Sequence, residues 1–133
     1  MRAFFLSCAF IFSVFTSVSA SEIGFAEVIS SQIEAFKNDD VETAFSFASP
    51  KVQTTFGTAQ NFGVMVQNTY PMIWRPADFK FLRGTSDRSI GMQEVIFFDG
   101  SGKSFTFAYE LVDISGSWKI NGVYRLETND VAV

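Results

Sequence analysis

The sequence contains no histidine and a single cysteine, and these two absences exclude much of the common chemistry of active sites. Serine triads, cysteine–histidine pairs and most zinc sites need an imidazole or a thiolate to move a proton or hold a metal near neutral pH. The one cysteine, Cys8, lies among the first twenty residues. Catalysis would therefore depend on carboxylates, tyrosines, lysines or main-chain dipoles. We expect no metal and no cofactor.

Basic residues are also few, with ten Lys and Arg against fourteen Asp and Glu. All fourteen acidic residues follow Ala20 while Arg2 precedes it, so the chain beyond Ala20 carries a net charge of about −5. A surface with this balance repels phosphate backbones, which argues against nucleic acid as a partner. The remaining Lys and Arg are scattered, and none of them form a cluster that would suit an anionic membrane.

The first twenty residues have the pattern of an export signal. An almost wholly apolar run from Ala3 to Phe15 is followed by Val18-Ser19-Ala20, which has small residues at the positions that a signal peptidase reads. The run is shorter than the roughly 20 residues that cross a bilayer as a helix, although a retained anchor is the alternative. We expect residues 1–20 to be a signal peptide, cleaved between Ala20 and Ser21. The mature chain would then be periplasmic or secreted, with no stable membrane insertion.

Residues 21–133 are long enough for one domain with one core, and their first half has a helical pattern. An amphipathic helix is predicted from Glu22 to Lys37 by apolar residues at spacings of three and four, namely Phe25, Ile29, Ile33 and Phe36. Asp39 and Glu42 form a capping-box pattern that opens a short second helix. Ser49-Pro50 starts a brief helical turn, and Thr58 caps a third helix that ends at Tyr70-Pro71.

Beyond Pro76 the hydrophobic period changes from helical to two, which predicts strands. Four are expected, at Phe79–Leu82, Gly91–Phe98, Ser104–Ile114 and Trp118–Leu126. On the last of them Trp118, Ile120, Gly122, Tyr124 and Leu126 should share one face. Helices followed by an antiparallel meander predict an α+β domain, with N-terminal helices packed on a curved antiparallel sheet of about four strands. The polar tail, residues 127–133, is expected to be loose.

The candidate pocket consists of polar and aromatic residues near the predicted concave face. A two-residue turn at Ser101-Gly102, or a four-residue turn around it, would place Glu94 opposite Tyr109. Matching the apolar faces of the next hairpin would place Tyr109 opposite Tyr124. A carboxylate among aromatic rings would have a raised pKa, and two phenols could donate to it or to a bound oxygen. The alternative is a bulge that turns Glu94 out to solvent.

Two other features each have both a functional and a structural explanation. Tyr70 and Trp74, where the helical half meets the sheet, could form the rim of a cleft or simply plug the end of the core. The pair Asp39-Asp40 could be catalytic carboxylates, but adjacent acids at a helix start are more simply explained as caps.

A family resemblance rests on two long runs of the sequence, QIEAFKNDDVETAFSFASPKVQTTFGTAQNFGVMVQNTY and YELVDISGSWKINGVYRL. These runs resemble a bacterial group, domain-of-unknown-function family 4864. Through that family the chain is similar to the nuclear-transport-factor-2-like (cystatin-like) superfamily, in which a long first helix and smaller helices close the concave side of a bent sheet. That superfamily includes isomerases, dehydratases, ligand binders and dimerisation modules, so the resemblance implies a fold but no activity. No catalytic residue can be carried across to this chain.

These observations favour an exported, non-catalytic domain that binds a small apolar ligand or a protein partner. One alternative is a histidine-free isomerase or dehydratase that uses a buried carboxylate and tyrosines, and another is a structural homodimerisation module. A homodimer would form through a mixed sheet surface that is predicted to face away from the core. That surface consists of Thr106, Ala108, Glu110 and Val112 on one strand, with Lys119, Asn121, Val123 and Arg125 on the next.

Overall fold

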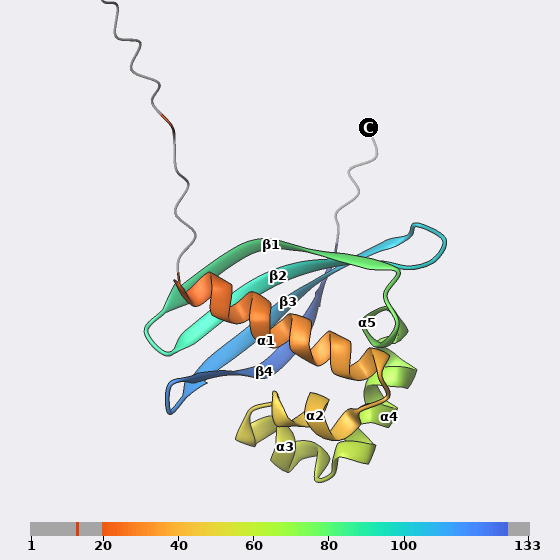
Figure 1. The fold of residues 1–133 in the computed structure, drawn as a ribbon, viewed down its shortest axis with the longest axis horizontal. Coiled ribbons are helices and arrows are strands. Elements are labelled where there is room, and N and C mark those ends of the chain that lie inside the picture. Colours follow the sequence, from red (N-terminus) through yellow and green to blue (C-terminus); the bar gives the residue numbers. More distant parts are fainter. Residues whose placement is uncertain (1–12, 14–19, 128–133) are drawn as a thin grey trace, which may run out of the picture.

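The computed structural model describes residue 13 and residues 20–127, and within them five helices precede four strands (Figure 1). The helices are α1 (Ala20–Lys37), α2 (Val41–Ser46), α3 (Pro50–Phe56), α4 (Ala59–Thr69) and α5 (Pro71–Trp74). The strands are β1 (Asp78–Asp87), β2 (Ile90–Phe98), β3 (Ser104–Ile114) and β4 (Ser117–Leu126). The expected α+β architecture is confirmed. The predicted signal peptide, apart from Ser13 and Ala20, and residues 128–133 of the tail lie outside the described residues.

The strands form one antiparallel sheet in the order β1-β2-β3-β4. Helix α1 crosses one face of this sheet, while α2, α3 and α4 gather at one end of it (Figure 1). Within residues 20–127, no helix combines the length and the apolar content that a membrane crossing requires. The sheet and helices therefore form two layers, with the core between them.

Helix α1 covers the sheet with the four apolar residues that its sequence spacing predicts. Phe25, Ile29, Ile33 and Phe36 are each no more than 1% exposed. The ring of Phe25 packs edge-on against Trp118 of β4, with ring centroids 4.8 Å apart. Because four positions on one helical face all reach the core, the first helix fixes the distance between the two layers.

The junction of α1 and α2 differs from the prediction by one residue. Asp39 has a left-handed backbone (φ 56°), and its amide and that of Asp40 donate to the Phe36 and Ala35 carbonyls. This Schellman-type ending uses Asp39 to close α1, so Asp40 becomes the N-cap of α2 and its side chain accepts from the Thr43 amide. Asp39 instead pairs with Arg75. Both acids therefore have structural roles here.

The caps of α3 and α4 are confirmed. The Ser49 side chain accepts from the Val52 amide at the start of α3, with Pro50 in the first turn. Thr58 accepts from the Asn61 amide at the start of α4, which ends before Tyr70-Pro71 as predicted. The following short helix, α5, was not predicted.

The predicted register between β2 and β3 is wrong by one residue. Tyr109 lies opposite Gln93, and Glu94 lies opposite Ala108. The cause is the connecting loop, which has five residues rather than the predicted two or four. The Asp99 carboxylate accepts from both the amide and the hydroxyl of Ser101 and from the Lys103 amide, and Gly102 has φ 85°. Because this loop has an odd number of residues, each β2 residue lies opposite a β3 residue one position away from the expected partner.

The predicted facing of β4 is correct only for its first half. A bulge shifts the register where Glu110 pairs with Gly122 and Leu111 pairs with Ile120, which leaves Asn121 as the extra residue. Because of this bulge, Tyr109 lies opposite Val123 rather than Tyr124. Trp118 and Ile120 face the helices as expected, but beyond the bulge it is Val123 and Arg125 that occupy the helix-facing positions, while Gly122, Tyr124 and Leu126 occupy the outer ones.

Candidate functional site

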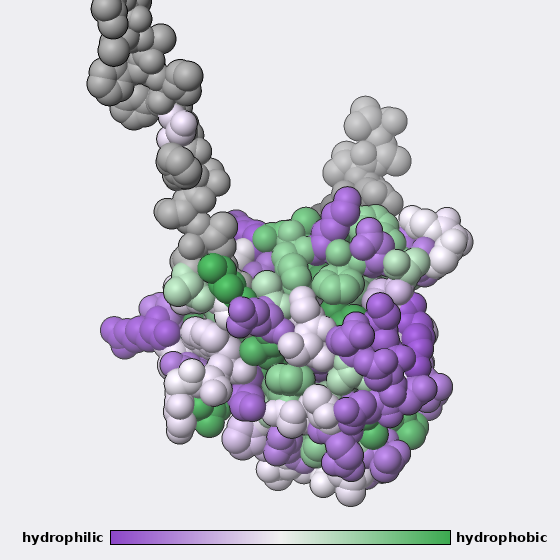
Figure 2. All heavy atoms as spheres, in the orientation of Figure 1, coloured by the Kyte–Doolittle hydropathy of each residue, from purple (hydrophilic) through white to green (hydrophobic). Residues whose placement is uncertain are grey.

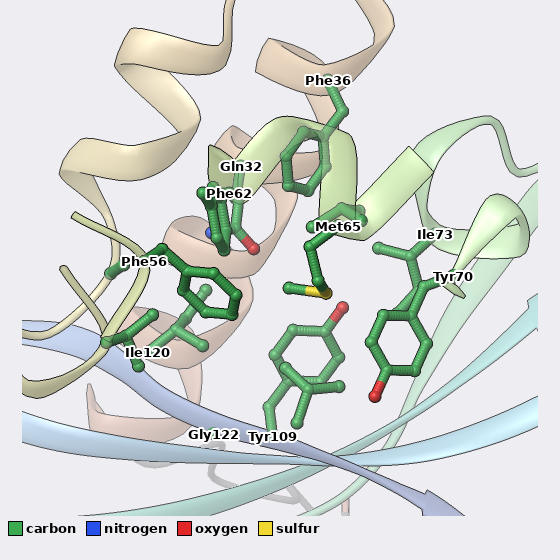
Figure 3. A pocket seen from close by; sticks show the side chains of 14 residues that line it. Gln32, Phe36, Phe56, Phe62, Met65, Tyr70, Ile73, Tyr109, Ile120 and Gly122 are labelled. Carbon is green, nitrogen blue, oxygen red and sulfur yellow. The ribbon is translucent and has the colours of Figure 1, made fainter. Parts of the chain in front are cut away.

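A cavity of about 220 Å³ lies between the helices and the sheet. Its walls come from α1, α3, α4, the segment around Tyr70, and strands β3 and β4 (Figure 3). Most of its lining is apolar, including Phe36, Phe56, Phe62, Met65, Ile73 and Ile120. The space therefore favours an apolar body over water.

Helix α4 forms one wall because Phe62, Met65 and Val66 recur at spacings of three and one, on the face turned toward the core. The ring of Phe62 contacts three other phenylalanine rings, at centroid distances of 5.4 to 5.9 Å. Gly63 allows close approach to α2, since a Cβ there would collide with the Val41 side chain. This wall of the cavity is therefore a helix that is held in place by side-chain packing.

A backbone clamp joins α3 to β4 at the bulge. The Ser49 amide donates to the Ile120 carbonyl and the Ile120 amide donates to the Phe47 carbonyl, each at 2.8 Å. The Ser49 hydroxyl donates to Asn121 Oδ1 at 2.7 Å. Ala48, beside the clamp, lines the cavity. The bulge therefore both turns Val123 inward and holds the start of α3 in place.

Tyr109 provides a fully buried hydroxyl at the cavity. Its side chain is fully buried, and its hydroxyl has no hydrogen-bond partner among the described residues. Figure 3 shows this hydroxyl pointing from β3 up toward Met65. Burial raises the pKa of the Tyr109 phenol, so the group stays protonated and remains a donor at neutral pH.

Gln32 of α1 provides an acceptor. The residue is 3% exposed, and its amide nitrogen donates to the Ala44 carbonyl at 3.1 Å. A carbonyl can only accept, so this bond fixes which end of the side-chain amide carries the nitrogen. The amide oxygen is left directed toward the cavity, as Figure 3 shows.

Charged side chains lie outside the cavity. Among the described residues that line it, none is Asp, Glu, Lys or Arg. Hydrophilic residues gather instead around the C-terminal end of α1, where Glu34, Lys37, Asn38, Asp39 and Asp40 are exposed (Figure 2). Residues 13 and 20–127 also contain no group of three or more His, Cys, Asp or Glu that could hold a metal ion.

The structure brings two of the five predicted pocket residues to the cavity. Tyr70 and Tyr109 line it, with their hydroxyls pointing in opposite directions (Figure 3). Trp74 is half-buried against Phe36, at a centroid distance of 5.3 Å, and does not line the cavity.

The other two predicted residues, Glu94 and Tyr124, lie on the opposite face of the sheet. Glu94 alternates with the buried Gln93 and Val95, and its neighbour across the strands is Ala108, which in turn pairs with Tyr124. Tyr124 is half exposed and donates from its hydroxyl to Glu110 at 3.2 Å, which raises the pKa of the Tyr124 phenol. The predicted row of Glu94, Tyr109 and Tyr124 is therefore not formed.

Sequence reasoning missed Gln32, although its position carried a signal. Gln32 falls between Ile29 and Ile33 on α1 and four residues before Phe36, on the same buried face. A polar residue within an apolar stripe is a candidate for a polar contact inside the core.

The outer sheet face is mixed, as the sequence predicts. Half-buried apolar residues, among them Met92, Ile96, Phe98 and Val112, surround Glu94 and Glu110 there. The expected membership changes in one respect, because the bulge turns Val123 and Arg125 to the inner face. A homodimer through this face stays a prediction, and light scattering at high micromolar concentration would test it.

The model of a family described as a domain of unknown function, DUF4864, matches residues 18–133. A search of curated proteins found no match.

Solved structures with the same fold share little sequence with the chain. It is similar to a SEC-C motif containing protein from Rhodopseudomonas palustris, at 15% identity over 75% of this chain and 77% of that one, with a TM-score of 0.58. NTF2-like proteins of unknown function from Shewanella oneidensis and Burkholderia xenovorans are similar as well. The first has 12% identity over 80% of this chain and 99% of its own, with a TM-score of 0.55. The second has 13% identity over 80% and 85%, with a TM-score of 0.51. These likenesses show an NTF2-like fold.

Proposed function

The chain belongs to the domain-of-unknown-function family DUF4864, and we propose that it is a non-catalytic binding protein whose cavity takes a small apolar ligand. The observation that supports this is the cavity itself, about 220 Å³ in volume with mostly apolar walls. An apolar cavity of about 150 Å³ in another protein stays dry and binds benzene, so a molecule of one or two rings would fit here. Binding would give the ligand dispersion contacts with the cavity walls and remove its apolar surface from water.

The chemistry of the lining favours binding over catalysis. An isomerase or dehydratase needs a group that removes a proton, and the described lining offers only phenols and an amide. Burial raises the pKa of Tyr109, so its phenol stays protonated at neutral pH and cannot take up a proton from a substrate. Glu94, the carboxylate that the catalytic alternative required, lies on the other face of the sheet.

We propose that the chain acts outside the cytoplasm. Support comes from the apolar run between Ala3 and Phe15 and the small residues of Val18-Ser19-Ala20, which together form a signal-peptide pattern.

The binding proposal is tested with naphthalene as the probe and a matched pair of cavity-filling and surface variants. Val123→Phe places a ring in the cavity, whereas Val112→Phe adds the same bulk on the outer sheet face. Calorimetric titration should detect naphthalene binding to the original protein and to Val112→Phe. Binding should be lost in Val123→Phe. Absence of binding to the original protein, or equal binding to both variants, would contradict the proposed site.

A further inference from the structure

The polar atoms in the cavity narrow the class of ligand, an inference that rests on the proposed function. We infer that the ligand is a neutral molecule with an apolar body and one hydroxyl group, which accepts a hydrogen bond from Tyr109 and donates one to Gln32. The two protein groups come from opposite layers, Tyr109 from β3 and Gln32 from α1. Both are directed into the same cavity (Figure 3).

The hydroxyl of Tyr109 is the first part of the argument. A fully buried donor without a partner destabilises a folded protein, and native structures contain few of them. The alternation of β3 puts Phe107 and Tyr109 side by side in the core, and a phenylalanine at position 109 would fill the same space without the orphaned group. The hydroxyl is explained if a ligand atom in the cavity accepts from it.

The amide of Gln32 is the second part. Its nitrogen donates to the Ala44 carbonyl, so the atom of this amide that is directed into the cavity is the acceptor oxygen. Tyr109 can supply a proton and Gln32 can receive one. A ligand hydroxyl satisfies both, because it accepts through a lone pair and donates through its own proton.

The absence of charged lining residues gives the third part. An ionised ligand would enter an apolar space with no opposite charge among the described lining residues, and this desolvation is expensive. The same argument excludes a ligand with several polar groups, since only a few polar atoms are available to meet them. The ligand class is therefore a small neutral alcohol or phenol.

The test compares four probes that share one ring system: 2-naphthol, 2-methoxynaphthalene, naphthalene and 2-naphthoate. At pH 7 the original protein should bind 2-naphthol about threefold to tenfold more tightly than naphthalene, the range expected for a net hydrogen bond. The methoxy compound, which only accepts, should fall between them. The charged carboxylate should bind more weakly than naphthalene.

Two matched variants separate the site from the general effect of losing a phenol. Tyr109→Phe should bind 2-naphthol no more tightly than naphthalene, while keeping its affinity for naphthalene. Tyr124→Phe removes a phenol hydroxyl from the outer sheet face and should keep the full preference for 2-naphthol.

The outcomes distinguish this inference from the proposed function. If naphthalene and 2-naphthol bind the original protein equally, or if the preference survives in Tyr109→Phe, the hydroxyl class is wrong while cavity binding stands. If 2-naphthoate binds the original protein as tightly as naphthalene does, or more tightly, the inference that the ligand is neutral is wrong. If none of the probes binds, the proposed function itself fails.

Discussion

The ring of Phe25 lies directly over the backbone of Gly91, so closely that a Cβ at position 91 would overlap three of its ring atoms. Phe25 is fully buried and packs edge-on against Trp118, so the ring has no room to move aside. The contact brings α1 close to the backbone of β2. It depends on a residue without a side chain.

Gly91→Ala should lower the free energy of unfolding by about 1–3 kcal/mol, because the added methyl overpacks a closed part of the core. Urea denaturation followed by tryptophan fluorescence measures the change. Gly100→Ala is the control, since a Cβ at position 100 meets nothing within 4 Å. Equal stabilities of the two variants would show that Phe25 can relax.

Tyr109→Phe should raise the free energy of unfolding of the ligand-free protein by about 1–2 kcal/mol, because it removes a buried hydroxyl that has no partner. The same denaturation assay measures this gain. Tyr124→Phe should not stabilise the protein, since its hydroxyl is bonded to Glu110 and half exposed. A destabilised Tyr109→Phe would mean that the hydroxyl is already satisfied in solution.

Local features of this fold were readable from the sequence, and long-range ones were not. The caps at Ser49 and Thr58 depend on residues within three positions, so the sequence pattern predicted them correctly. The bulge at Asn121 depends on Ser49, 72 residues earlier in the chain. The period-two pattern of β4 does not indicate such a distant partner. The prediction therefore continued the alternation through Asn121 and assigned Tyr124 to the wrong face of the sheet.

The candidate site was predictable only where one strand determined it. Tyr109 was placed in the core because large apolar residues and smaller or polar ones alternate along the sequence of β3 from Phe105 to Leu111. Glu94 depended on the length of the Asp99–Lys103 loop, which the Asp99 carboxylate sets by bonding to two amides and a hydroxyl. With this loop, Glu94 lies on the sheet face away from the cavity, so the catalytic alternative loses the carboxylate that it required.

Ser49→Ala should lower the free energy of unfolding by about 1–3 kcal/mol. The substitution removes the cap of α3 and leaves Asn121 without its buried partner. Ser46→Ala is a suitable control, because its hydroxyl bonds only a nearby carbonyl on the exposed side of α2. We also expect Ser49→Ala to weaken naphthalene binding, since α3 carries part of the cavity wall. Unchanged stability would show that the backbone clamp alone holds α3.

Acid should weaken the β2–β3 loop through Asp99. The hydrogen bond from Ser101 is the main cause that lowers the pKa of Asp99 below its usual 3.8. A carboxyl whose pKa is lower in the folded state stabilises fully above the unfolded value, and this contribution is lost as the pH falls through the folded value. Asp99→Asn keeps an acceptor but cannot titrate.

The stability difference between the original protein and Asp99→Asn should therefore be constant above about pH 5 and should shrink below about pH 4. Urea denaturation between pH 2.5 and 7 measures it. A difference that stays constant down to pH 2.5 would show that protonation of Asp99 does not affect folding.

Export can be tested together with ligand retention in one measurement. If residues 1–20 are a cleaved signal, the protein recovered from the periplasm or medium should begin at Ser21, and its mass under denaturing conditions should be lower by that of residues 1–20. Cleavage there would remove Ala20, the first residue of α1, and leave every buried residue of that helix in place. A matched sample of Ala20→Pro should stay uncleaved at this site if the small residue is what the peptidase reads.

Native mass spectrometry of the exported protein should then show an added small mass that Val123→Phe lacks. An intact N-terminus on the exported protein would contradict the predicted signal peptide. If a sample that still binds naphthalene shows no added mass, the natural ligand has dissociated during purification.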